Sequence, residues 1–260
     1  MVMLIAVDDV FLTTVLHPVS PNPDGARPRV TTGDFDNHIT WQTEINGVMN
    51  PGSNYFIELA FNGNGNEEQA APASNWVCPK AVVRNDPLFT DQSLEWLKPI
   101  GTGTDVWPAG QQYIWTQQCL LLDGLASYFQ NTANRDAFSW LSHTFTHENL
   151  DNATLSDAYK EITFNQQHAT NLGLNSAARW SPNGLVPPAI TGLHNGDALQ
   201  AFFENGITNV VGDNSRPVLL NPTNPHWPLI TTVAGNGYAG VQITPRWPTR
   251  IFFDWYVHFH

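Results

Sequence analysis

Two histidines separated by three residues, His143 and His147, have the spacing that most directly suggests chemistry. Side chains four positions apart project to the same side of a helical turn, close enough to share one ion. Imidazole is a common ligand for zinc and related divalent metals. The pair could equally be two hydrogen-bonding loop histidines, so the spacing alone leaves both interpretations open.

A pair of acidic residues supports the metal interpretation. Asp8 and Asp9 directly follow the apolar residues 3–7. Two carboxylates are costly to bury in an apolar core, so their position directly after an apolar strand suggests that they have a functional role at the strand's end. Because histidine motifs need such a confirming context, we treat the two acids and the two histidines as candidates for one site.

The elements that must position these residues alternate between strands and helices. Apolar runs predict strands at residues 2–7, 55–61, 137–141, 177–180, 207–211, 229–233 and 240–243. Helical spacing and capping residues predict helices at residues 111–130, 154–172 and 195–204, and an earlier helix that is capped by Thr32 or Asp34 and runs to about residue 46. Residues 62–65 are expected to form a sharp turn, and residues 66–110 a long irregular insertion that covers the site.

This order predicts an α/β fold, a single distorted (β/α) barrel with long loop insertions, in which parallel strands are joined by helical crossovers. In such barrels the reactive residues lie on loops at the carboxyl ends of the strands. Five polar clusters fall at predicted strand ends: Asp8-Asp9, residues 62–64, His143 to His147, residues 179–183 and Asp213. Their common placement at strand ends is stronger evidence for a functional site than any one cluster alone.

Composition narrows the class of partner. The net charge is -12, and charged residues are only 13% of a chain that is 42% hydrophobic. Surface polarity must then come from Asn, Thr, Ser and Gln, which suits neutral polar ligands such as sugars. Nucleic acid is not expected as a partner, because phosphate contacts need clustered Lys and Arg. No stretch approaches the roughly 18 apolar residues of a membrane helix.

The two cysteines of the chain are Cys78 and Cys119. They could form one disulfide in an oxidising compartment or remain two buried thiols. We predict that they are bonded, because they lie in and beside the long insertion, where a crosslink would limit the freedom of the loop.

The order of these motifs resembles that of the NodB-type polysaccharide deacetylases, carbohydrate esterases that remove N-acetyl groups. The strings at residues 63–65, 101–107, 143–147 and 245–250 are similar to those of the secreted fungal galactosaminogalactan deacetylases. The resemblance covers residues 2–251 and implies one deacetylase-like domain over residues 1–260. The last residues depart from the family pattern, which leaves open a truncated C-terminal end.

The resemblance also implies roles for individual residues. Asp9, His143 and His147 would bind one divalent metal, taken to be zinc, and Asp8 would be the general base. Arg179 would lie beside Asp8, with Asp213 in support. The chain departs from the family in the loop after Arg179 and at its terminal motif, where no match for the general-acid histidine is found. The candidates for that acid are His194, His226, His258 and His260.

The implied substrate is a polymer of N-acetylgalactosamine or N-acetylglucosamine, and the implied location is secreted or associated with the cell wall. The residues near the proposed rim that we expect to contact it are Asn64, Trp180, Asn183 and Trp247. Residues 1–7 are too short and lack the basic flank of a signal peptide, so the targeting segment is expected to be missing from the chain. Two alternatives remain: an inactive carbohydrate-binding relative, and a non-haem iron oxygenase, which also uses two histidines and a carboxylate.

Overall fold

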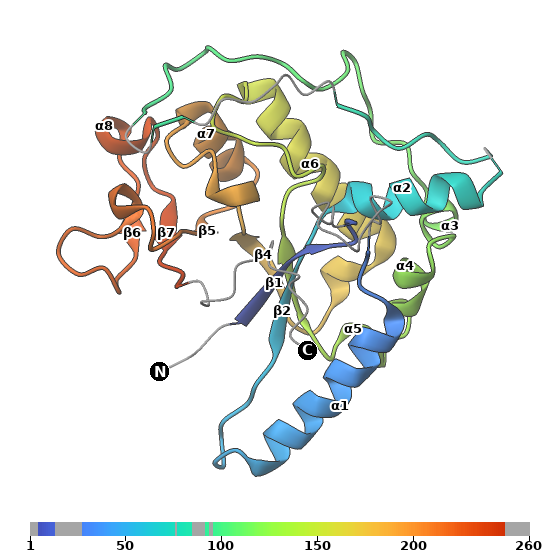
Figure 1. Ribbon diagram of the computed structural model, residues 1–260. Helices are drawn as coiled ribbons and strands as arrows, with labels where there is room; N and C mark the ends of the chain where they lie inside the picture. Colours follow the sequence, from blue (N-terminus) through green and yellow to red (C-terminus); the bar gives the residue numbers. More distant parts are fainter. Residues whose placement is uncertain (1–4, 14–27, 76, 85–91, 94–95, 248–260) are drawn as a thin grey trace, which may run out of the picture.

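The computed structural model describes residues 5–13, 28–75, 77–84, 92–93 and 96–247. A seven-stranded sheet in the order β1-β2-β3-β4-β5-β7-β6 curls into a half-barrel with helices around it (Figure 1). Every strand pair is parallel except β6 and β7. This confirms the predicted α/β class. The strands are β1 (Ile5–Val10), β2 (Ile57–Phe61), β3 (Ser139–Ser142), β4 (Trp180–Leu185), β5 (Asn209–Val211), β6 (Leu229–Ile230) and β7 (Gln242–Thr244).

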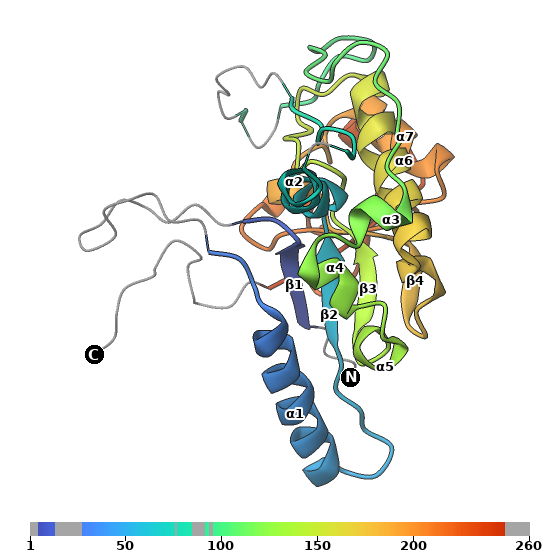
Figure 2. The ribbon, with the colours of Figure 1, turned by 90° about the vertical axis from the view of Figure 1, so that its right-hand side faces the viewer.

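The helices lie between the strands along the chain. They are α1 (Thr32–Val48), α2 (Gly63–Ala73), α3 (Gln117–Leu120), α4 (Gly124–Tyr128), α5 (Thr132–Arg135), α6 (Leu155–Leu172), α7 (Gly196–Glu204) and α8 (Val233–Asn236). Short 3-10 turns occur at Leu174–Ser176, Pro188–Ile190 and Pro217–Leu219. In Figure 2 the arrowheads of β1 and β3 point toward α2, whereas α1 lies at the other end of these strands. Within the described residues, no helix combines the length and the apolar character needed to cross a membrane.

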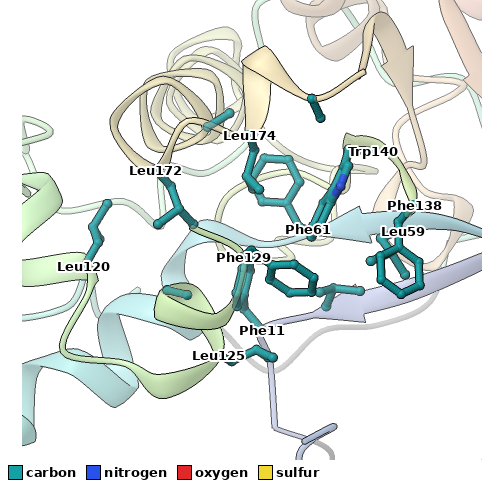
Figure 3. Packing of buried hydrophobic residues seen from close by; sticks show 14 of the residues in the cluster. Phe11, Leu59, Phe61, Leu120, Leu125, Phe129, Phe138, Trp140, Leu172 and Leu174 are labelled. Carbon is teal, nitrogen blue, oxygen red and sulfur yellow. The ribbon is translucent and has the colours of Figure 1, made fainter. Parts of the chain in front are cut away.

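Strand β2, which lies between β1 and β3, is packed on both of its faces. All five of its residues are buried, and neighbouring side chains on a strand point to opposite faces. Leu59 and Phe61 belong to a large aromatic core, whereas Ala60 packs with Leu141 and Val186 in a smaller cluster. Figure 3 shows the aromatic core, in which the rings of Phe129 and Trp140 meet edge to face at 4.7 Å.

The longest helices begin and end as their sequences dictate. Helix α1 is capped by Thr31, one residue before Thr32, the earlier of the two predicted caps, because Thr31 and Asp34 form a reciprocal capping box. Helix α6 is capped by the Thr154 side chain, and Gly173 ends it in the left-handed conformation at φ 80°. The predicted span of α6 is therefore confirmed within one residue.

The predicted turn at residues 62–65 is wrong, because helix α2 begins at Gly63. Glycines are required there by close packing and not by a turn. A Cβ on Gly63 would lie 2.7 Å from both the His168 and Phe145 rings, and one on Gly65 would lie 2.4 Å from the carbonyl oxygen of Phe11. The two glycines therefore let the start of α2 pack directly against α6, the loop after β3 and the end of β1.

Two other predicted elements also differ. The helix expected at residues 111–130 is broken into α3 and α4, because Asp123 accepts hydrogen bonds from the backbone N–H of Leu125 and from Asn66 and thereby starts a new helix. The strand expected at residues 177–180 begins only at Trp180, and it runs on through the residues that we predicted as a loop. Its register against β3 shifts between Trp140 and Ser142, which accommodates the extra residues as a bulge.

The insertion between α2 and α3 is attached to the helices that follow β3 and β4. Lys98 is buried and pairs with Asp197 of α7 at 2.5 Å, and the backbone N–H of Val106 donates to Asp157 of α6 at 2.6 Å. Cys78 is joined to Cys119 by a disulfide, with their Cα atoms 5.8 Å apart. These contacts hold described parts of the insertion beside the ends of the strands.

Candidate metal centre

The parallel pairing of β1, β2 and β3 brings the ends of these strands to one edge of the sheet. Asp8 and Asp9 are near the end of β1, and His143 directly follows β3. The pairing of β1 with β2 shifts between Val7 and Val10, and Asp9 has a φ of 63°. This irregularity lets two successive carboxylates leave the strict alternation of a strand.

The structure brings Asp9, His143 and His147 together. The Asp9 Oδ1 atom lies 3.3 Å from Nε2 of His143 and 3.4 Å from Nε2 of His147. One ligand atom from each residue lies within 4.8 Å of the other two, and among the described residues this is the group of three or more metal-binding side chains that meets this condition. The two histidines lie in a loop, not on the helical turn that their spacing suggested.

The three side chains fit a divalent metal in chemistry and in orientation. Nδ1 of His143 donates to the carbonyl oxygen of Val186 at 2.7 Å, because a carbonyl can only accept. This bond fixes the tautomer whose Nε2 lone pair faces the other two ligands, which is the usual support for a metal-binding imidazole. The His143 side chain is 2% exposed, but those of His147 and Asp9 are 34% and 50% exposed. One side of the site therefore remains open to a substrate.

The protonation of these groups reflects both burial and each other's charge. Burial lowers the pKa of His147 to about 4, with a further lowering from His143, so its imidazole is neutral near pH 7. Burial opposes the charged form of His143, but the hydrogen bond to Asp9 and the charges of Asp8 and Asp9 raise its pKa overall. Burial alone would raise the pKa of Asp9, but the hydrogen bond and the charge of His143 lower the pKa of this carboxyl overall.

Asp8 faces a different partner. Both of its carboxylate oxygens accept from Nη1 of Arg246, at 2.9 and 3.2 Å. Arg246 follows β7, and its backbone carbonyl accepts from the N–H of Asn214 at 3.0 Å, just after β5. Asp8 is thus held beside the three-residue group by an arginine from the opposite part of the sheet.

The expected contact between Arg179 and Asp8 is corrected by the structure. Arg179 precedes β4, donates to the backbone carbonyl of Asp136, and stacks 3.6 Å above the ring of Phe56. Both partners precede their strands, so Arg179 lies at the amino ends of β2 and β3. The expectation failed because we placed the end of β4 at residue 180, where the strand in fact starts.

The other predicted polar residues lie in varied places. Asp213 follows β5, and its carboxylate accepts from the N–H of Ser215 at 2.7 Å, which caps a turn. Asn64 is buried in α2, where its N–H donates to the Phe145 carbonyl of the histidine loop at 3.1 Å. Asn183 is exposed on the bulge of β4. Asn64 therefore borders the histidine loop through its backbone.

The predicted aromatic residues also separate into two groups. Trp180 is partly buried at the start of β4 and packs against the aromatic core, with its ring 6.1 Å from that of Phe61. Trp247 is 52% exposed and stacks on His226 at 5.0 Å. It directly follows Arg246, which contacts Asp8. Of the histidines considered as general acid, His258 and His260 lie outside the described residues.

The sequence reasoning gave no individual role to three residues of this region: Arg246, Asn62 and Glu161. Arg246 lies in a Pro-rich string after a predicted strand, and that placement was the available signal. Asn62 donates to the carbonyl oxygens of His143 and Thr144 at 2.5 and 3.0 Å. Glu161 is a fully buried acid on α6, and its recurrence four residues after Asp157 on a helix with an apolar face could have marked it.

Comparisons with known proteins agree with this arrangement. A family model described as the Agd3 deacetylase domain matches residues 3–258. The chain is also similar to a solved structure described as the crystal structure of Agd3, a novel carbohydrate deacetylase, with 48% sequence identity and a TM-score of 0.90. That likeness covers 96% of this chain and 37% of the other, so the chain spans just over a third of the relative's length. None of the curated proteins compared with the chain matches it. The family model covers nearly the whole chain, and the chain therefore belongs to the Agd3 deacetylase domain family.

Proposed function

We propose that this domain is a metal-dependent hydrolase that removes N-acetyl groups from a polysaccharide containing N-acetylhexosamine. The observation that carries the proposal is the convergence of one carboxylate and two imidazoles, with ligand atoms within 4.8 Å of one another, next to a second carboxylate held by Arg246. The similarity to a carbohydrate deacetylase supports the same reaction. Charged residues make up only 13% of the chain, and the many uncharged polar residues suit a sugar polymer as the substrate.

Asp9, His143 and His147 would hold the metal, and we propose zinc. When bound, a divalent metal polarises the acetyl carbonyl and makes a bound water more acidic. Asp8 has no place in the ligand set, so its carboxylate remains able to take the proton of the attacking water. Arg246 restrains Asp8 through both of its oxygens and thereby orients the base.

Substrate binding would use the open side of this site. Trp247 is 52% exposed and its ring stacks on that of His226, and we propose that its exposed part contacts a sugar ring. Asn183 is exposed on the bulge of β4 and could hydrogen-bond to sugar hydroxyls. We propose that the polymer contains N-acetylgalactosamine or N-acetylglucosamine, and that the protein is secreted or associated with the cell wall, a location with which the Cys78–Cys119 disulfide is consistent.

The test measures metal content and acetate release together. Purified protein loaded with Zn²⁺ is expected to retain one equivalent of metal and to release acetate from a partly acetylated hexosamine polymer. Removal of the metal by a chelator should stop the release, and added Zn²⁺ should restore it. His143→Ala should lose the metal while its circular dichroism spectrum stays close to that of the wild type.

If the metal-loaded protein releases no acetate from any such polymer, the proposed reaction is wrong. Binding of the polymer in the absence of turnover would then favour a carbohydrate-binding role. Consumption of O₂ with Fe²⁺ in the site would instead favour the oxygenase, which uses the same ligand types.

A further inference from the structure

One face of helix α6 carries four polar residues that are completely buried. Asp157, Glu161, Asn165 and His168 are each 0% exposed. Their spacing of four, four and three residues aligns them along one side of the helix. Buried polar groups are costly unless they are hydrogen-bonded. Their partners therefore show what this face of the helix holds in place.

Glu161 uses both carboxylate oxygens on the loop that carries the two histidines. Its Oε2 accepts from the backbone N–H groups of Phe145 and Thr146, both at 2.9 Å. Its Oε1 accepts from the Thr146 hydroxyl and from the indole N–H of Trp107 at 3.0 Å. Four donors thus converge on one side chain, and only a carboxylate presents acceptors on both oxygens.

The loop held in this way has an unfavourable backbone conformation. Thr144 and His147 have φ angles of 62° and 61°. Non-glycine residues in the left-handed region cost free energy and persist only where surrounding contacts impose them. Asn62 binds the carbonyl oxygens of residues 143 and 144, and Glu161 binds the N–H groups of residues 145 and 146. The two side chains therefore hold four consecutive residues of the loop, 143 to 146.

The same face of α6 also fixes part of the long insertion. Asp157 accepts from the backbone N–H groups of Val106 and Trp107, at 2.6 and 3.3 Å. Trp107 then reaches Glu161 through its indole N–H. The Trp107 ring lies 6.0 Å from that of Phe145. The insertion and the histidine loop are consequently joined through one carboxylate.

We propose that Glu161 is a positioning residue for the metal centre: its carboxylate imposes the loop conformation that aims His143 and His147 at Asp9, and it links that loop to Trp107. The inference rests on the proposed function for the role of the metal. The restraint on the loop, however, is a property of the protein without metal and can be measured separately.

The main test is Glu161→Gln. The substitution keeps the size of the side chain but puts an NH₂ group opposite two of the four donors. In metal-free protein, the amide hydrogens of Phe145 and Thr146 should exchange at least tenfold faster than in the wild type, while those of β2 and β3 stay protected. The Kd for Zn²⁺ should rise by about ten- to a hundredfold, the usual effect of removing a group that orients a metal ligand. The visible spectrum of the Co²⁺-substituted protein should also change.

Rescue distinguishes positioning from a general loss of packing. Thr146→Val combined with Trp107→Phe removes both donors that face Oε1. In the triple variant with Glu161→Gln, the amide oxygen can accept the two backbone N–H groups while the NH₂ group faces no donor. The Kd for Zn²⁺ should then return to within about fivefold of the value for the Thr146→Val, Trp107→Phe double variant. Glu44→Gln, at an exposed position of α1, is the matched control for charge and should leave both readouts unchanged.

Three outcomes would overturn the inference. Glu161→Gln could leave the exchange of Phe145 and Thr146 and the Kd at their wild-type values. It could instead speed exchange equally throughout the sheet, which would indicate a general structural role. The triple variant could also bind Zn²⁺ as weakly as Glu161→Gln itself.

If the wild type binds no metal, the proposed function fails, yet the exchange data still decide whether Glu161 restrains the loop. Should Glu161→Gln not fold, Glu161→Asp, which shortens the side chain by one methylene group, must show faster exchange of Phe145 and Thr146, and wild-type rates would reject the inference.

Discussion

At the scale of single residues, the centre depends on how two neighbouring carboxylates are divided between two partners. Asp9 faces the two histidines, and Asp8 faces Arg246. The positive φ of Asp9 and the shifted register of β1 make this division possible. A base that bound the metal would lose proton affinity, so separate roles for the two acids suit hydrolysis.

The first prediction separates these two roles. Asp8→Asn should retain one equivalent of metal and lose acetate release by roughly a hundredfold or more, the usual effect of removing a general base. Asp9→Asn should weaken metal binding first, because it replaces a ligand. Metal analysis and acetate assays on both variants check this division. The reverse result, with metal lost from Asp8→Asn and kept by Asp9→Asn, would exchange the two assignments.

The second prediction compares two arginines. Arg246→Gln should retain the metal but lower kcat by about ten- to a hundredfold, since the base would lose its orientation. Arg179→Gln removes the same charge at the amino ends of the strands and should keep kcat within about twofold. Steady-state kinetics and metal analysis of both variants make the comparison. A larger loss of kcat in Arg179→Gln would restore the role that the motif order suggested for it.

At the scale of elements, helix α6 joins the strand ends, the histidine loop and the insertion. Asn165 donates to the carbonyl oxygen of Phe61 and to the Ser142 hydroxyl, at 3.0 and 2.8 Å. Further along, His168 lies among aromatic rings, and its Nδ1 is 3.1 Å from the hydroxyl of Tyr113. The helix therefore buries a titratable ring in the centre of the molecule.

The third prediction follows from that ring. Burial lowers the pKa of His168 from 6.5 to about 3. In the interval between these values the unfolded chain binds a proton that the folded chain does not, so the free energy of unfolding falls as the pH falls. The slope contributed by one such group is at most about 1.4 kcal/mol per pH unit. Proton binding by the unfolded chain lowers the free energy of unfolding roughly between pH 7 and pH 4. Urea unfolding of the wild type at several pH values in this interval should show the decrease.

The control for that experiment is His168→Gln, which keeps a polar group near Tyr113 but cannot be protonated. Its free energy of unfolding should be lower than that of the wild type at about pH 7, where His168 is mostly neutral in both the folded and the unfolded wild-type chain. It should also depend less on pH below that value. An unchanged pH dependence would mean that other groups, and not His168, cause the acid sensitivity.

At the scale of the whole molecule, the insertion is held to the half-barrel by a covalent bond and by buried polar contacts. The disulfide between Cys78 and Cys119 crosses 41 residues of sequence. Both cysteines pack against the large aromatic core. Lys98 and Asp197 form a second, buried attachment between the insertion and α7. The insertion thus depends on the packed domain for its position near the site.

The fourth prediction concerns this crosslink. Replacing both Cys78 and Cys119 by serine should lower the free energy of unfolding by about 2–4 kcal/mol, because the unfolded chain regains the freedom of a long loop. Denaturant titration measures the change, and thiol titration of the unfolded, unreduced wild type should detect no free thiol. Two free thiols in that titration would show that the bond does not form in the protein.

Local patterns in the sequence were sufficient for several features of the molecule. Apolar runs indicated the strands, and Thr154 and Gly173 bounded α6. The grouping of Asp8 and Asp9 with the two histidines followed from ligand chemistry at strand ends, and the family resemblance selected Asp9 as the ligand. These features depend on residues that are neighbours in sequence, or on the general rule that parallel strands end at one edge. The α/β class and the likeness to polysaccharide deacetylases could therefore be predicted.

Only the tertiary structure decided which arginine meets the base and which groups hold the histidine loop. Asp8 and Arg246 are 238 residues apart in sequence, and Arg179 was separated from Asp8 by a strand boundary that local patterns placed wrongly. Glu161 and Asn62 bind backbone groups of residues 143–146. Every residue type carries these backbone groups, so the residue types at these positions do not indicate the contacts. Helical and strand periodicity report the environment of each side chain. They do not report which distant segment supplies its partner, because that choice depends on how the whole chain packs.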